Sequence, residues 1–382
     1  MTKITGNWLS DPATQTVFSM LTDAGFKAYA VGGCVRNAVF GVSVIDVDIA
    51  TDALPKKVMA LAKAAGLNPI PTGIDHGTIT VVSSGTPFEV TSFRKDIATD
   101  GRRAVVAFSD NINDDAKRRD FTMNALYCTA DGLIIDPLSG MQDAVDRNLI
   151  FIDDPDQRIR EDYLRILRFF RFYALYCDPA NGIDANGLAA CAQNLDGLSS
   201  LSKERIGAEM RRLLGAADPS PAMAAMAQSG VLRQVLPIAN PQYLAPLIAL
   251  EEANNIPPSW LRRLGVIGTK DARNALCLTR KEQKHLDQLA KAMANGGLSE
   301  SSYRFSPTVA LDATMIVAAT LGSPMPTDFQ QQIDLGATAR FPISASDLMP
   351  DIPAGPKLGA ELRRLENIWI KSGFLLDKSG LI

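Results

Sequence analysis

The 382-residue sequence contains only two histidines, His76 and His285, and five cysteines without a Cys-x-x-Cys pair. Two imidazoles are too few for a binuclear His/Asp phosphohydrolase centre or a zincin. The scattered cysteines signal neither a zinc site nor a disulfide framework, so reduced, structural cysteines are expected. The chain also lacks an apolar run long enough to cross a bilayer and an apolar signal-peptide core. These absences predict a cytoplasmic protein with no membrane partner.

Length and composition indicate a folded protein with more than one structural unit. Hydrophobic residues make up 46% of the chain and charged residues 21%, as in globular proteins. With 382 residues the chain exceeds one ordinary domain. Strand and helix signals mix up to about residue 152, and the pattern is helical from residue 153 onward. This change predicts an α+β fold with an N-terminal head, built on a small mixed β-sheet and helices, followed by helical segments.

A glycine pair, Gly32-Gly33, follows a strand-like run at 29–31 and precedes a helical pattern at 34–40. A strand, a glycine turn and a helix N-terminus bring unbonded backbone NH groups and the positive end of a helix dipole together. Phosphate binds at such points, and the guanidinium of Arg36 is placed to fork onto its oxygens. Gly-Gly before a helix is otherwise a simple tight turn, so a second motif has to decide.

Asp46 and Asp48 supply that second motif. They alternate with Ile45, Val47 and Ile49, which is the period-two pattern of a half-buried strand, so both carboxylates are expected on one face. Two acids on one face, with no basic residue between them, require a cation. Oxygen ligands of this kind suit Mg²⁺, which completes its octahedron with waters and substrate phosphates. The two motifs together predict a nucleoside-triphosphate enzyme.

A third carboxylate, Glu89, lies in one of two further predicted strands, at 77–82 and 88–94, which a turn at 83–86 connects. A hairpin packed beside the strand of Asp46 and Asp48 brings Glu89 to the same ion. The following residues, 97–113, are rich in Asp, Asn and Arg and are predicted to form a mobile loop.

A helix is predicted over 161–172 with one apolar arc and one charged ridge. Asp162, Arg165 and Arg168 form the ridge as i, i+3 neighbours. The core arc comprises Tyr163, Ile166, Leu167, Phe170, Tyr173 and Ala174. Because the arginines exceed what local pairing requires, the ridge is expected to bind an external partner instead of forming a surface salt bridge.

Hydrogen-bond complementarity narrows that partner to two nucleobases. Cytosine and adenine each present an amino donor beside a ring-nitrogen acceptor, whereas uracil and guanine present a carbonyl beside a ring NH. An ionised Asp only accepts and an Arg only donates. Asp162 beside Arg165 therefore complements C and A and rejects U and G, since a wrong base leaves buried charged groups unpaired.

With the block Arg118-Arg119-Asp120-Phe121-Thr122 added, the chain resembles the class II tRNA nucleotidyltransferases, that is, the bacterial CCA-adding enzymes and their poly(A) polymerase relatives. The resemblance covers residues 29–214. Beyond the motifs above, it includes Asp136-Pro137 with Gly140, the run Leu201-Ser202-Lys203-Glu204-Arg205-Ile206, and two C-terminal patterns at 346–348 and 355–359. Any single motif can arise by chance, but this ordered set indicates the family.

The resemblance implies site residues and an activity. Asp46 and Asp48 hold the catalytic Mg²⁺, with Glu89 as the third catalytic carboxylate. The implied nucleotide-binding residues are Gly32, Gly33, Arg36 and Arg119 at the triphosphate, Asp120 and Asn124 near the ribose, Asp162 and Arg165 as the template for the base, and Arg168 and Arg171 nearby. The implied activity adds C, C and A to the tRNA 3′ end from CTP and ATP by two-metal transfer, with release of pyrophosphate.

The implied division is a head at 1–152, a nucleobase-binding neck at 153–215, and a body at 216–290 and a tail at 291–382 that bind tRNA. The oligomeric state stays open. One departure from the family pattern is Asn37, where the family usually has Asp. Asparagine keeps the hydrogen-bonding capacity but loses the charge, so activity is expected to survive.

Alternatives from the same family and from another class remain open at this point. A poly(A) polymerase is disfavoured because residues 70–77 lack that group's basic, arginine-phenylalanine element. An enzyme that adds only CC is disfavoured because residues 97–113 retain the loop sequence Asp100-Gly101-Arg102-Arg103, and addition of A alone is a further partial activity. A non-catalytic RNA-binding protein is disfavoured because Asp46 and Asp48 are both present.

Overall fold

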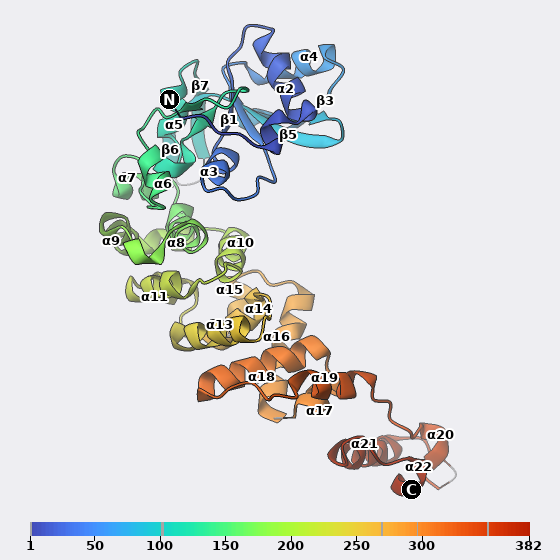
Figure 1. Ribbon diagram of the computed structural model, residues 1–382. Coiled ribbons are helices and arrows are strands. Elements are labelled where there is room, and N and C mark those ends of the chain that lie inside the picture. Colours follow the sequence, from blue (N-terminus) through green and yellow to red (C-terminus); the bar gives the residue numbers. More distant parts are fainter. Residues whose placement is uncertain (1, 101–102, 269, 296, 350) are drawn as a thin grey trace. The chain divides into compact units, whose positions relative to one another are not determined.

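The computed structural model describes residues 2–100, 103–268, 270–295, 297–349 and 351–382. The chain forms two compact units, Met1–Ile238 and Ala239–Ile382. The first unit begins with a mixed β-sheet and helices and continues with helices, and the described part of the second unit is helical (Figure 1). This arrangement confirms the predicted α+β class. The fourfold division stays a prediction, and helix α16 (Arg280–Asn295) runs through the predicted boundary at residue 290.

A seven-stranded sheet with the order β3-β4-β5-β2-β1-β8-β9 organises the N-terminal region. Its strands are β1 Ala28–Val31, β2 Asp48–Thr51, β3 Asn68–Gly73, β4 Thr78–Ser83, β5 Thr86–Ser92, β8 Tyr127–Cys128 and β9 Ile134–Ile135. The pair β2–β5 is parallel and the other pairs are antiparallel. Strands β2 and β5 therefore run side by side in the same direction, and Asp48 of β2 lies opposite Glu89 of β5.

The α-helices of the first unit are α1 Asn7–Ser10, α2 Pro12–Thr22, α3 Gly33–Val39, α4 Pro55–Ala64, α5 Ile112–Lys117, α6 Met141–Val145, α7 Pro155–Glu161, α8 Leu164–Tyr176, α9 Ala185–Gln193, α10 Lys203–Leu214, α11 Ser220–Gln228 and α12 Val231–Val235. Those of the second unit, besides α16, are α13 Leu244–Ala253, α14 Trp260–Ile267, α15 Ala272–Ala275, α17 Leu298–Arg304, α18 Pro307–Leu321, α19 Phe329–Thr338, α20 Ala345–Leu348, α21 Pro356–Lys371 and α22 Lys378–Leu381.

Local signals place several elements close to where the sequence predicts them. The glycine turn separates β1 from α3, with Gly32 at φ 73°, a conformation that side-chain-bearing residues rarely adopt. Helix α4 begins at Pro55, whose fixed φ suits the first helical position. Strands β4 and β5 form the predicted hairpin around Ser84 and Gly85, both with positive φ.

Two local predictions are wrong. Strand β2 begins only at Asp48, so Asp46 lies before the strand and Ile45, expected on the buried side, is 87% exposed. Only Val47 and Ile49 are buried, because the preceding residues have no strand partner. The predicted mobile loop at 97–113 instead contains most of an antiparallel hairpin, β6 Arg94–Asp100 with β7 Arg103–Phe108, and the start of α5. Residues 101–102 of that loop lie outside the described residues.

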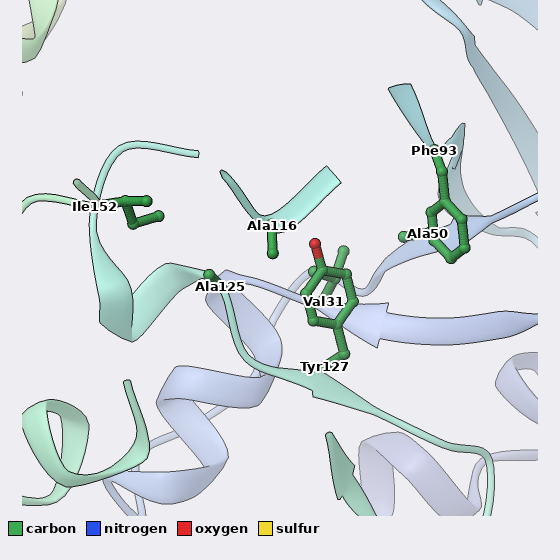
Figure 2. Close-up of a cluster of buried hydrophobic side chains, with 7 residues drawn as sticks. All are labelled: Val31, Ala50, Phe93, Ala116, Ala125, Tyr127 and Ile152. Atoms are coloured by element: carbon green, nitrogen blue, oxygen red, sulfur yellow. The ribbon is translucent and has the colours of Figure 1, made fainter. Parts of the chain in front are cut away.

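An apolar cluster links the sheet to α5 (Figure 2). It consists of Val31, Ala50, Phe93, Ala116, Ala125, Tyr127 and Ile152, all with at most 3% exposure. Tyr29 packs against it and meets the Tyr127 ring edge-on, with ring centroids 6.4 Å apart. The cluster fixes α5 and β8 on the strands that carry the glycine turn and Asp48.

A second group of aromatic rings joins the head to helix α8. The Phe121 ring lies 4.8 Å from Phe151 and 5.1 Å from Phe172, between ring centroids, and Phe151 stacks on Phe169 at 5.4 Å. Tilted and stacked ring contacts of this kind add to the stabilisation from burial. Because Phe121 follows Asp120 directly, this packing holds the Arg118–Asp120 segment against α8.

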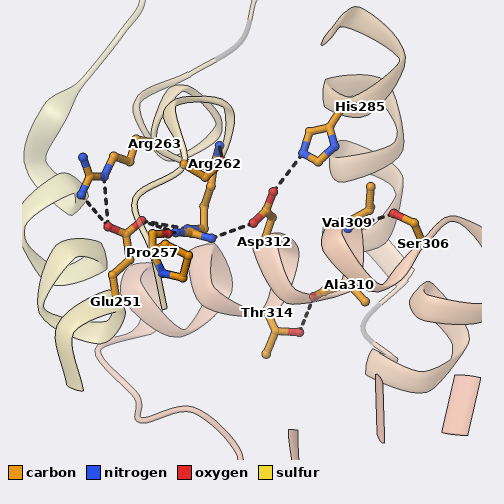
Figure 3. Close-up of polar contacts among 11 residues, drawn as sticks. Glu251, Pro257, Arg262, Arg263, His285, Ser306, Val309, Ala310, Asp312 and Thr314 are labelled. Carbon is orange, nitrogen blue, oxygen red and sulfur yellow. Dashed lines mark hydrogen bonds and ion pairs between the residues drawn. The ribbon is translucent and has the colours of Figure 1, made fainter. Parts of the chain in front are cut away.

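The second unit contains a buried ion cluster that ties four helices together (Figure 3). Glu251 of α13 accepts hydrogen bonds from Arg262 and Arg263 of α14. Asp312 of α18 accepts from Arg262 at 3.0 Å and lies 2.9 Å from Nε2 of His285 in α16. The basic stretch 281–289 has the pattern of a solvated surface helix, which would leave His285 exposed; the structure instead turns its ring inward to the buried carboxylate of Asp312. No described helix has the length and apolar content needed to cross a membrane.

Candidate active site

A pocket of about 660 Å³ in the first unit collects most of the residues predicted as a site. The predicted residues that line it are Gly32, Gly33, Arg36, Asp48, Arg119, Asp120, Asn124, Asp162, Arg165, Arg168 and Arg171. Asp46 and Glu89 are not among the lining residues; both are exposed and neighbour Asp48 in sequence or in the sheet. The structure therefore gathers residues from the glycine turn, the Arg118–Asn124 segment and the α7–α8 region around one space.

The carboxylates form a site of strong negative charge at the start of β2. Desolvation in the pocket and the nearby charge of Glu89 raise the pKa of Asp48 to about 6, with Asp46 adding to the effect and Arg119 opposing it. Burial is thus the larger cause of the raised pKa, and the like charges of Glu89 and Asp46 add to it. Within the described residues no group of three or more His, Cys, Asp or Glu side chains is already arranged as metal ligands. The oxygen donors nevertheless fit a hard divalent cation, which would relieve the repulsion.

Arg36 is fixed at the glycine turn by two hydrogen bonds and a cation–π contact. Its Nη1 donates to Oδ1 of Asn124 at 2.6 Å and its Nη2 to Oδ1 of Asn37 at 2.9 Å. Its guanidinium carbon lies 3.7 Å from the centroid of the Tyr176 ring in α8, a cation–π contact. Asn37 in turn donates to the carbonyl of Ser43, so the asparagine that departs from the family pattern retains an orienting contact with Arg36.

Asp120 and Arg168 form a pair between the head and α8. Both Nε and Nη2 of Arg168 donate to Oδ2 of Asp120, and Oδ1 of Asp120 accepts from Asn124 at 3.0 Å. Burial alone would raise the pKa of Asp120, but the charge of Arg168 and these hydrogen bonds outweigh it and lower the pKa to about 2. Asp120 is therefore ionised and its position is fixed before any nucleotide binds.

Two models of known protein families match the chain. The Poly A polymerase head domain matches residues 28–150, and the probable RNA and SrmB-binding site of polymerase A matches residues 182–243. Among curated proteins, the mitochondrial CCA tRNA nucleotidyltransferase 1 of Mus musculus is 31% identical over 373 residues, covering 92% of this chain and 84% of the relative. The chain belongs to this family of CCA-adding tRNA nucleotidyltransferases.

Bacterial relatives and a solved structure agree with that membership. The CCA-adding enzyme of Geobacillus thermodenitrificans is 34% identical over 294 residues, covering 73% of this chain and 68% of the relative. The crystal structure of the Bacillus stearothermophilus CCA-adding enzyme in complex with CTP superimposes with a TM-score of 0.75 at 26% identity, covering 95% and 94% of the two chains. The family resemblance stated from the motifs is thus confirmed, and membership implies dependence on a divalent metal ion.

In this member of the CCA-adding family, the predicted charged ridge has a different local structure. Helix α7 ends at Glu161, and Asp162 is extended, with φ −153° and ψ 104°. Its Oδ1 accepts from the backbone NH of Leu164 at 3.1 Å, so the side chain competes with helix continuation and supports the start of α8. Asp162, Arg165 and Arg168 still line one pocket, but only Arg165 and Arg168 are neighbours on one helix.

The expectation of spare arginines is also wrong for this CCA-adding family member. Arg165 pairs with Glu161 at 2.5 Å, Arg171 with Glu209 at 2.6 Å, and Arg168 with Asp120. The Arg165 pair is visible in the sequence as an i, i+4 spacing. The partners of Arg168 and Arg171 come from distant segments, which no local pattern reveals.

Other pocket residues were not predicted from the sequence. Arg205 of α10 donates to Oδ2 of Asp162 at 2.7 Å, and Tyr176 supports Arg36. The run 201–206 was noted for its resemblance to the family, but Tyr176 carried no signal beyond its place in an apolar helix. The pocket is additionally lined by Arg94, Arg118, Leu164, Phe172 and Arg212.

Proposed function

We propose that this protein adds C, C and A to the 3′ end of tRNA from CTP and ATP without a nucleic-acid template, releasing pyrophosphate. The observation that carries the proposal is the convergence in one pocket of Asp48, the Gly32-Gly33 turn and the base-complementary pair Asp162 and Arg165. Metal-binding, phosphate-binding and base-reading groups are the three parts that such a transfer requires.

The carboxylates carry the chemistry in this proposal. Asp46, Asp48 and Glu89 hold Mg²⁺, which when bound lowers the pKa of the RNA 3′-hydroxyl and neutralises the leaving pyrophosphate. Crowding of like charge around Asp48 supports this role, because it favours binding of a cation. No side chain is required as a general base beyond these carboxylates.

Arginines and glycines bind and orient the nucleotide. Gly32 and Gly33 leave room for phosphate at the turn, and Arg36 and Arg119 face the triphosphate. Asp120 and Asn124 lie near the ribose, where their mutual hydrogen bond keeps both side chains in place. Arg168 and Arg171 contact the nucleotide from α8.

Asp162 and Arg165 select the base. Asp162 accepts from the exocyclic amino group of C or A, and Arg165 donates to the neighbouring ring nitrogen. Arg165 also donates to Glu161 and to the backbone carbonyls of Arg158 and Arg118, and these contacts orient its guanidinium, which has five N–H donors in all. The helices beyond residue 215 hold tRNA by phosphate contacts, which makes affinity dependent on salt. Cytoplasmic location stays a prediction.

The test is incorporation of labelled CTP and ATP into tRNA that lacks its 3′ CCA. We expect addition of two C residues and one A in the presence of Mg²⁺, loss of addition with EDTA, and recovery on adding Mg²⁺. Addition of many A residues would assign a poly(A) polymerase, and arrest after CC, or addition of A alone, would assign a partial activity. Intact tRNA binding without any incorporation would contradict an enzymatic function.

A further inference from the structure

Arg119 is a pocket arginine whose Nε and Nη2 atoms are bound by two buried side chains, Asp115 and Tyr127. Its Nη2 donates to Oδ2 of Asp115 at 2.9 Å, and its Nε lies 3.3 Å from the same oxygen and 3.2 Å from the hydroxyl of Tyr127. Within the part of the chain that the structure describes, Nη1 has no hydrogen-bond partner. Nη1 lies 3.3 Å from the point where a Cβ on Gly32 would be, so the free end of the guanidinium faces the glycine turn.

The two side chains that bind Arg119, Asp115 and Tyr127, are buried and hydrogen-bonded to each other. The Tyr127 hydroxyl donates to Oδ2 of Asp115 at 2.7 Å, and Oδ1 of Asp115 accepts from Nε of Arg118 at 2.8 Å. Asp115 has 1% exposure and Tyr127 none. Burial would raise the pKa of Asp115, but the charges of Arg119 and Arg118 outweigh it and lower the pKa to about 2, so the carboxylate stays ionised.

The placement of a hydroxyl at residue 127 requires a reason, because the Tyr127 ring belongs to the apolar cluster of Figure 2. The figure shows the ring among Val31, Ala50 and Phe93, with its oxygen end toward the segment that carries Ala116. Phenylalanine would fill this space without a polar group to satisfy. The hydroxyl is instead used for contacts with Asp115 and Arg119.

We propose that Tyr127 and Asp115 are positioning residues that fix Arg119 with its Nη1 toward the Gly32 turn, where it binds the triphosphate and the leaving pyrophosphate. This inference rests on the proposed function. A flexible arginine loses side-chain entropy when it grips a ligand, and a guanidinium held in advance avoids that loss and needs no reorganisation as charge develops. Tyr127 touches no substrate in this arrangement and acts through Arg119.

The first experiment compares two identical substitutions in one cluster of the full-length protein. Tyr127→Phe removes the hydroxyl that contacts Arg119, and Tyr29→Phe removes a hydroxyl from the neighbouring ring, which contacts neither Arg119 nor Asp115. We expect kcat/KM to fall about tenfold with both CTP and ATP for Tyr127→Phe, and the CTP-to-ATP ratio to stay constant. Tyr29→Phe should change kcat/KM less than twofold. Equal effects of the two variants would overturn the proposal.

The second experiment separates positioning from a general loss of structure. The Arg119→Lys variant lacks the guanidinium that Tyr127 and Asp115 bind. Adding Tyr127→Phe to this variant should therefore change kcat/KM less than twofold. A tenfold loss in both backgrounds would show that Tyr127 does not act through Arg119, and the proposal would fall.

A binding measurement keeps this proposal distinct from the proposed function. If the wild-type protein incorporates neither CTP nor ATP, the proposed function fails. The positioning of Arg119 is then tested by calorimetry, as the affinity of each variant for inorganic pyrophosphate with Mg²⁺. Weaker binding by Tyr127→Phe than by Tyr29→Phe supports positioning of Arg119. Equal affinities of both variants and the wild type overturn it.

Discussion

Arginines meet carboxylates in two regions of this protein, and the two regions differ in what surrounds the pairs. In the pocket of the first unit, Arg168 holds Asp120 while 31% of its side chain stays exposed. In the ion cluster of the second unit, the Arg262, Arg263, Glu251 and Asp312 side chains are each at most 3% exposed (Figure 3). An arginine–carboxylate pair therefore does not mark a site by itself. The open side of the pair decides whether a ligand can reach it.

The two regions should consequently respond to mutation in opposite ways. In the pocket, burial and the nearby charges of Glu89 and Asp46 raise the pKa of Asp48, so the loss of this charge should cost activity more than stability. In the ion cluster each carboxylate contacts two basic side chains: Glu251 contacts both arginines of α14, and Asp312 contacts Arg262 of α14 and His285 of α16. A lost charge there should therefore cost stability more than activity.

The largest effect is expected for Asp48→Asn. Of the three carboxylates proposed to hold Mg²⁺, the substitution removes the one that lines the pocket. It should lower kcat on the order of 1,000-fold, since a lost group that stabilises transition-state charge costs about 10²–10³. Relief of repulsion with Glu89 should leave the free energy of unfolding in metal-free buffer no lower than that of the wild type. Nucleotide incorporation and urea denaturation measure the two quantities, and a large loss of stability with normal kcat would contradict the assignment of this region as the active site.

Arg262→Ala is expected to have the largest effect on stability. It leaves Glu251 with one partner and Asp312 without its arginine, and breaking a buried pair in this way costs about 3–5 kcal/mol. Urea denaturation measures the loss, and the affinity of the folded variant for CTP should be unchanged.

Arg364→Ala is the matched control for that experiment. Arg364 pairs with Glu361 in α21, but its side chain is 58% exposed, so solvent screens the interaction and no measurable loss of stability is expected. Similar losses in the two variants would show that burial does not set the strength of these pairs.

A smaller effect is expected from the pH dependence of the Asp120–Arg168 pair. The pKa of Asp120 is about 2 in the folded protein, below its ordinary value of 3.8. Because the folded value is the lower one, its stabilisation is fully present above about pH 4 and is lost as the pH falls from 4 toward 2. The shift corresponds to about 2 kcal/mol. Asp120→Asn should therefore be less stable than the wild type by this amount at pH 6, and the difference should vanish near pH 2; a difference that is constant with pH would contradict the pairing.

The sequence predicted those parts of the fold and the site that depend on neighbouring residues. The turn at Gly32, the proline-initiated α4 and the β4–β5 hairpin follow from local conformational preferences, and the placement of Glu89 beside Asp48 follows from a hairpin joining a small sheet. Composition was misleading at 97–113, where polar residues suggested a loop but pairing between β6 and β7 gives a hairpin.

Long-range partners set the limit of sequence-based prediction. The pairing of Arg171 with Glu209 and of Arg168 with Asp120 depends on the packing of α8 against α10 and against the Phe121 ring. All these residues are visible in the sequence, but nothing in the sequence pattern shows that they lie close together in the fold. The break at Asp162 was missed for a different reason, since a side chain that bonds its own backbone looks the same as a helical residue in an amphipathic pattern.

The smallest effect is expected for Asp162→Ala, which tests whether this pocket-lining carboxylate selects the base. Arg205 and the Leu164 backbone NH hold the Asp162 carboxylate in place, so its removal takes away an oriented acceptor for the amino group of C or A. One well-placed recognition contact is worth about 1–3 kcal/mol, so the preference for CTP over UTP should fall about tenfold while Mg²⁺ dependence is retained. Asp156→Ala is the control, because Asp156 pairs with Arg160 in the same α7–α8 region but does not line this pocket. Unchanged selectivity in Asp162→Ala, or equal changes in both variants, would mean that the base is read elsewhere and that the contacts of Asp162 serve only to join α7 to α8.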